Sequence, residues 1–113
     1  MDVQQWLDAG YKRYNKDYFN NADFLLQKCV KDDVGRKYFI DIWVYNHANT
    51  EYFREGMPEI SFQPEVQIQG REPVMNVTLL VTATTLSVQG IESEFENLWK
   101  SLGCPYYEKY EDN

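Results

Sequence analysis

Few residues in this chain have side chains that could carry out chemistry. His47 is the only histidine among the 113 residues, and Asp41 is the nearest acidic residue along the strand predicted to precede it. A histidine with a carboxylate and a serine can form a nucleophilic site, so a small enzyme with its site near His47 and Asp41 is one hypothesis. However, no nucleophile elbow, phosphate-binding glycine loop or paired-carboxylate motif accompanies these residues. We therefore expect a protein that is not an enzyme, and the sequence assigns no catalytic residue.

The two cysteines, Cys29 and Cys104, indicate neither a metal centre nor a redox motif. They are far apart, no Cys-x-x-Cys pair occurs, and a structural zinc site needs four ligands at paired spacing. A Cys29–Cys104 disulfide is an alternative, but two thiols in a reducing compartment are the simpler expectation. No signal-peptide pattern and no run of about 20 apolar residues is present. We expect a cytoplasmic protein without metal, cofactor or membrane contact.

The net charge of −7 is concentrated in the second half of the chain. Residues 1–56 carry eight basic and nine acidic side chains, whereas residues 57–113 carry three and nine. Such acidity repels phosphate backbones, so we expect no direct nucleic-acid binding. It favours an alternative function, an acidic nucleic-acid mimic that inhibits a host-defence or DNA-binding protein. The acidic surface would consist of Glu92, Glu94, Glu96, Glu108, Glu111 and Asp112, although a solvated helix face is the simpler explanation of the acidic residues on the helix.

The elements that position these residues follow from hydrophobic periodicity and turn residues. The predicted elements of a single domain, residues 1–113, are a helix over 3–15, strands over 24–31, 36–46, 59–69 and 74–82, a helix over 88–102 and a tail over 104–113. A three-residue loop, Asp33-Val34-Gly35, joins the first two strands, with Gly35 in the left-handed conformation. We expect an α+β, two-layer sandwich (α-β-β-β-β-α), in which both helices cover one face of a four-stranded antiparallel sheet.

The strand over residues 36–46 carries large apolar side chains on both of its faces. Tyr38, Ile40, Ile42 and Val44 point to one face, and Phe39, Asp41, Trp43 and Tyr45 point to the other. Phe24, Leu26 and Val30 of the preceding strand are expected to share the first of these faces. The second face must be covered, either by the tail with Tyr106, Tyr107 and Tyr110, by the loop 47–58, by a second copy of the chain, or by another protein. Because aromatic residues often dominate interfaces, we expect Phe39, Asp41, Trp43 and Tyr45 to form a protein-interaction surface.

Two segments resemble small uncharacterised proteins of phages and prophages. One is the hairpin sequence QKCVKDDVGRKYFI, from Gln27 to Ile40, and the other is LWKSLGC, from Leu98 to Cys104. The resemblance covers part of the chain and implies an origin in a mobile element, with a role as an accessory protein. It implies no activity and no site residues.

Overall fold

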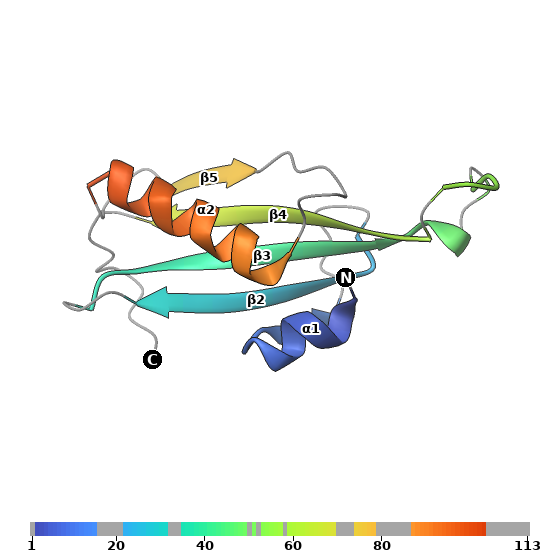
Figure 1. Cartoon of the computed structure of the whole chain (residues 1–113), viewed down its shortest axis with the longest axis horizontal. Helices are drawn as coiled ribbons and strands as arrows, with labels where there is room; N and C mark the ends of the chain where they lie inside the picture. Colours follow the sequence, from blue (N-terminus) through green and yellow to red (C-terminus); the bar gives the residue numbers. More distant parts are fainter. Residues whose placement is uncertain are drawn as a thin grey trace.

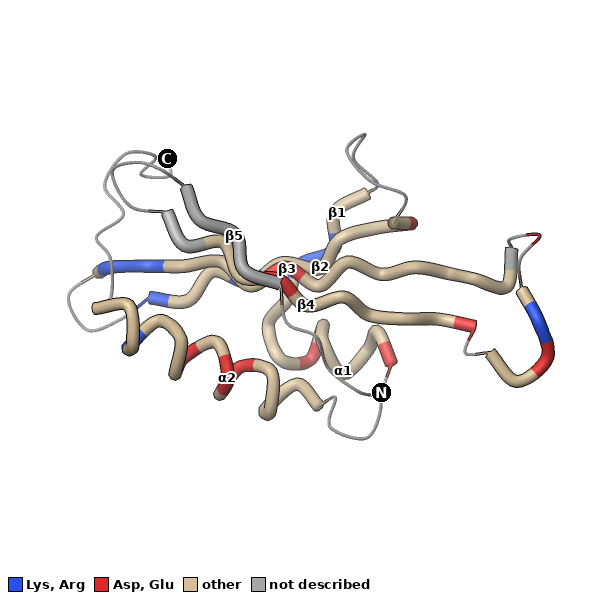
Figure 2. The backbone as a smooth tube through the Cα atoms, turned by 90° about the horizontal axis from the view of Figure 1, so that it is seen from above, with Lys and Arg blue, Asp and Glu red and all other residues tan. Residues whose placement is uncertain are grey.

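The computed structural model describes residues 2–15, 22–31, 35–49, 51, 53–57, 59–69, 74–78 and 87–103. The elements are α1 (Val3–Asp8), β1 (Lys12–Asn15), β2 (Phe24–Lys31), β3 (Lys37–Asn46), a short 3₁₀ helix η1 (His47–Asn49), β4 (Ile60–Gln69), β5 (Val74–Thr78) and α2 (Val88–Ser101). In this part of the chain the strands form one antiparallel sheet in the order β1-β2-β3-β4-β5. Both helices lie on the same side of the sheet (Figures 1 and 2). The predicted α+β, two-layer arrangement is confirmed.

The first helix is much shorter than predicted, because Gly10 ends it. The chain turns at Gly10 with φ of 99°, and the Gly10 and Tyr11 amides donate to the carbonyls of Leu7 and Trp6 at 3.0 and 3.1 Å. These two bonds form a Schellman motif, which stops a helix at a left-handed glycine. The Tyr11 ring then packs edge-on against Trp6, with ring centroids 4.9 Å apart. The prediction of a helix over 3–15 was therefore wrong beyond residue 8.

The end of that predicted helix is instead a fifth strand, β1. Its residues pair with the first half of β2, from Lys12 opposite Gln27 to Asn15 opposite Phe24. The Arg13 guanidinium lies 3.8 Å from the centre of the Phe24 ring, a cation–π contact that holds the edge strand to the sheet.

The hairpin of β2 and β3 has the predicted register. The pairs run from Phe24 opposite Val44 to Lys31 opposite Lys37, and Gly35 has a φ of 86°. Leu26 pairs with Ile42 and Val30 with Tyr38, so the apolar rows of the two strands share one face, as expected.

The remaining boundaries differ from the predicted ones by small amounts. β3 begins at Lys37 rather than at residue 36, β4 at Ile60 rather than 59, and α2 ends at Ser101 rather than 102. Ser87 caps α2 by accepting a hydrogen bond from the Gly90 amide at 3.0 Å. Residues 79–82 of the fourth predicted strand and the tail 104–113 lie outside the described residues. No helix in the described ranges is long and apolar enough to cross a membrane.

The core lies between the helices and the face of the sheet that they cover, which we call the helix face. Trp6 from α1 and Ile91, Phe95 and Trp99 from α2 are buried there. They pack with the inward rows of β2, β3 and β4: Leu26, Tyr38, Ile40, Ile42, Val44 and Val66. The opposite face, turned away from both helices, is called the distal face below.

Candidate protein-interaction surface

The distal face brings together the residues that the alternation of β3 predicted. Phe39, Asp41, Trp43 and Tyr45 point to this face because the other residues of β3 point into the core. Trp43 is flanked by Leu25 on β2 and Gln63 on β4. The distal face therefore has an aromatic row along its central strand.

The aromatic members of this row keep part of their surface exposed. Phe39, Trp43, Tyr45 and the neighbouring Leu25 are all half-buried, in contrast to the core residues of the helix face, whose exposure is close to zero. Tyr14 of β1 pairs with Leu25 and is 46% exposed, so it extends the apolar surface towards the sheet edge. The described residues of the 47–58 loop lie beyond the ends of β3 and β4 (Figures 1 and 2), so they do not cover the centre of this face.

Asp41 is fully buried within the row and is held from both sides. Its Oδ1 accepts a hydrogen bond from Gln27 Nε2 of β2 at 2.7 Å, and its Oδ2 accepts one from Gln67 Nε2 of β4. Burial raises the pKa of the Asp41 carboxyl above its ordinary value, the two glutamine donors oppose that rise, and the nearby Glu65 adds to it. Asp41 thus contributes an internal polar network rather than an accessible charge.

His47 extends the aromatic row at the end of β3. Its imidazole stacks on the Tyr45 ring at a centroid distance of 6.3 Å and an interplanar angle of 8°. His47 Nε2 and Ser61 Oγ are hydrogen-bonded at 2.7 Å. Burial, and then the charge of Glu65, raises the pKa of Tyr45, so this aromatic side chain remains neutral at physiological pH.

The structure does not bring His47 and Asp41 into one site. They are six residues apart along an extended chain, which corresponds to about 20 Å at roughly 3.3 Å per residue. Asp41 is inaccessible, whereas His47 is half-buried at the end of the hairpin. The two residues on which the enzyme hypothesis rests therefore do not lie in one site. In the described part of the chain, no group of three or more His, Cys, Asp or Glu side chains could hold a metal ion.

The predicted acidic surface is only partly a free surface. Glu94 and Glu96 are exposed on α2, and acidic positions are visible along that helix in Figure 2. Glu92 is bound internally, because Lys28 Nζ and the Tyr11 hydroxyl donate to its Oε2 at 2.9 and 3.0 Å. Burial, followed by the charge and the hydrogen bond of Glu92, raises the pKa of Tyr11 well above its usual range. Glu108, Glu111 and Asp112 lie outside the described residues.

Three members of the distal face, Tyr14, Leu25 and His47, were missed by the sequence prediction. The alternation that places Leu26 on the helix face was the available signal for Leu25. Tyr14 falls within the predicted helix over residues 3–15, which in the structure ends before it, and only the glycine at position 10 signalled the break. His47 was treated as an isolated histidine, and its position two residues after Tyr45 was the available signal that it continues the row.

Comparison with known proteins gives no relative to guide the assignment. No family model matches the chain, and no curated protein or solved structure matches it either.

Proposed function

We propose that this small acidic protein is a non-catalytic protein–protein interaction module, and that the distal face of its sheet is the contact surface. The surface consists of Tyr14, Leu25, Phe39, Trp43 and Tyr45, with His47 at its end. The occupant that we propose is a second copy of the chain, related by a two-fold axis.

One observation carries this proposal: β3 has large apolar side chains on both faces, and the two helices cover only one face (Figure 2). The aromatic side chains of the other face retain exposed surface. Interface energy is concentrated in tryptophan and tyrosine at the centre of a contact patch, and Trp43 lies on the central strand between Leu25 and Gln63.

The charge of the distal face favours a second copy of this acidic chain as the occupant. Of the described charged residues of this face, Lys37 and Asp41 are buried, and Lys12, Lys31 and Glu65 keep exposed surface, so the accessible charge of the face is small. The whole chain has a net charge of −7, and exposed carboxylates lie on α2, behind the sheet. Two copies that meet through their distal faces therefore avoid most of their mutual repulsion.

The test compares Trp43→Ser with Leu102→Ser, which removes a 39%-exposed leucine at the end of α2, away from the distal face. Sedimentation equilibrium measures the dimer dissociation constant of each protein. Loss of a central tryptophan should raise it by about 30-fold or more, and the Leu102 variant should match the wild type. An unchanged constant for Trp43→Ser would contradict the proposal, as would a monomeric wild type whose thermal stability falls on this substitution, since Trp43 would then be ordinary core.

The alternatives make different predictions about salt. The apolar contact proposed here is insensitive to ionic strength, whereas an acidic nucleic-acid mimic that uses Glu94 and Glu96 would bind a basic protein and lose affinity steeply as salt rises. The cytoplasmic location and the absence of direct nucleic-acid or membrane binding belong to the same proposal. A role as a phage or mobile-element accessory protein rests on the resemblance of the β2–β3 hairpin and the Leu98–Cys104 segment.

A further inference from the structure

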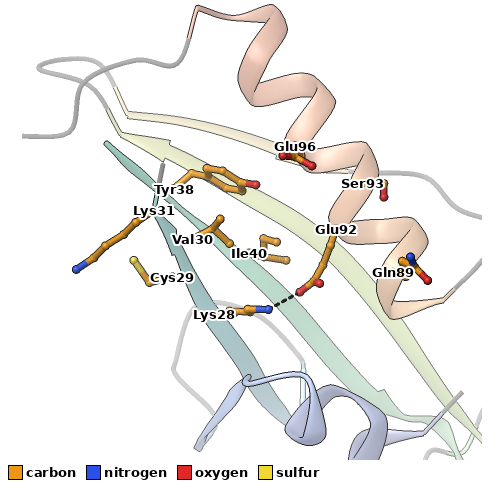
Figure 3. A pocket seen from close by; sticks show the side chains of 10 residues that line it. All are labelled: Lys28, Cys29, Val30, Lys31, Tyr38, Ile40, Gln89, Glu92, Ser93 and Glu96. Atoms are coloured by element: carbon orange, nitrogen blue, oxygen red, sulfur yellow. Dashed lines mark hydrogen bonds and ion pairs between the residues drawn. The ribbon is translucent and has the colours of Figure 1, made fainter. Parts of the chain in front are cut away.

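A groove on the helix side of the molecule lies apart from the proposed contact surface (Figure 3). It runs between α2 and the second half of β2 and has a volume of about 440 Å³. Sites for small molecules commonly have volumes of about 300–1,000 Å³. α2 packs against β3 and β4. A space therefore remains between this helix and the neighbouring strand β2, and this space is the groove.

The floor of the groove is apolar and rigid. Val30, Tyr38 and Ile40 line it, and the last two are 4% and 0% exposed because they belong to the core. The Tyr38 ring is supported from the core by Trp99, with ring centroids 5.0 Å apart. An apolar ligand body would therefore meet a preformed surface, which reduces the entropy cost of binding.

The wall of the groove contains a fixed carboxylate with one unused oxygen. Lys28 Nζ and the Tyr11 hydroxyl both donate to Oε2 of Glu92. Both bonds use the same oxygen, and among the described residues no hydrogen bond to Oε1 of Glu92 is found. Because Lys28 and Tyr11 hold the carboxylate in place, its second oxygen can accept a hydrogen bond from a ligand without reorganisation.

The charges around the groove favour a positively charged ligand. Glu96 lies one helical turn beyond Glu92 and also lines the groove. Lys31 lines the groove at its edge, but its side chain runs away from α2 and its carboxylates (Figure 3). Two carboxylates and the Lys28 ammonium therefore face the space, which leaves one negative charge. Lys100, which pairs with Glu96 at 3.3 Å, does so in an exposed ion pair that contributes little.

We propose that this groove binds a small organic cation, namely a protonated primary amine on an aliphatic or aromatic body. The ammonium group donates to Oε1 of Glu92 and lies close to Glu96, and the apolar body lies on Val30, above the buried Tyr38 and Ile40. A neutral ligand of the same shape lacks the charge-assisted hydrogen bond, so it binds more weakly.

The probe is 2-phenylethylammonium chloride, titrated into the ¹⁵N-labelled full-length chain and followed by amide chemical shifts, with 2-phenylethanol as the neutral control. The amine is expected to shift the amides of Val30, Ile40, Glu92 and Ser93 with a dissociation constant of about 1 mM. The alcohol should bind about tenfold more weakly. Equal affinity for the two compounds, or an absence of shifts at the groove at saturating millimolar amine, would overturn the proposal.

A matched pair of variants tests the role of the charge. Glu96→Gln removes a carboxylate that lines the groove, and Glu94→Gln removes another exposed carboxylate on the same helix that does not line it. Glu96→Gln is expected to weaken amine binding severalfold and to leave binding of the alcohol unchanged, while Glu94→Gln leaves both unchanged. If the two variants weakened amine binding equally, the general acidity of α2 would explain the attraction and the proposed site would be refuted.

Discussion

Replacement of Asp41 by asparagine is expected to change how the stability of the fold depends on pH. Asp41 is fully buried, and burial raises the pKa of its carboxyl above the ordinary value despite the two glutamine donors. Between the unfolded and the folded pKa, the folded chain therefore binds more protons than the unfolded chain. The contribution of Asp41 to the unfolding free energy is then fully present below the unfolded pKa and is lost as the pH rises through the folded pKa, with a slope of up to about 1.4 kcal/mol per pH unit.

Asparagine and alanine at position 41 are expected to have different effects on stability. Asparagine keeps the shape of Asp41 and removes its charge, and its amide can bond to Gln27 and Gln67 if one of the two glutamine amides turns over. Alanine leaves both glutamine donors without their acceptor, which costs about 1–3 kcal/mol. Asp41→Ala is therefore expected to be less stable than the wild type at every pH, and Asp41→Asn at least as stable as the wild type at neutral pH.

The assay is urea unfolding, followed by circular dichroism at a series of pH values from acidic to neutral and at one protein concentration for all variants. As the pH rises, the unfolding free energy of Asp41→Asn should increase relative to that of the wild type, and the difference between the two should then become constant. A difference that is independent of pH, or one that moves in favour of the wild type, would refute the reasoning, because the glutamine donors would then outweigh the cost of burial.

Two further predictions concern the end of α1 and its contact with α2. Gly10→Ala forces a side chain into a conformation with φ of 99° and should lower the unfolding free energy by about 1–2 kcal/mol in the same urea assay; an unchanged stability would show that the Schellman turn is not needed. Tyr11→Phe removes the donor to Glu92 and should cost about 1 kcal/mol. Because burial and Glu92 raise the pKa of Tyr11, the tyrosinate absorbance of the two proteins should remain identical through the ordinary tyrosine range, and a titrating difference there would contradict this burial.

The hairpin could be predicted from the sequence because its signals are local. The alternation of β3, the glycine at position 35 and the short loop all specify the same register, and the structure has that register. The first helix could not be sized correctly, because Val3, Trp6, Leu7 and Tyr11 continue a helical period through the turn. The decisive feature is the left-handed Gly10, after which Tyr11 still packs on Trp6 although it is no longer helical.

The candidate surface could be predicted only as far as one strand. The alternation of β3 correctly grouped Phe39, Asp41, Trp43 and Tyr45, but it could not show that Asp41 would be buried between Gln27 and Gln67, since these come from two other strands. In the same way, the bond of Glu92 to Lys28 joins residues 64 positions apart. A helical pattern reports which residues share a face, and it does not report which of them are engaged by a distant element.

The measurement that tests the central claim most directly is the solution mass of the wild-type chain by size exclusion with light scattering. The claim that the distal face binds a second copy predicts about twice the 13.4 kDa of one chain. It also predicts that this mass persists when salt is raised from about 0.1 M to about 1 M, because an apolar contact is not screened. A mass of 13.4 kDa at high protein concentration would contradict the claim, and so would a dimer that dissociates as salt rises.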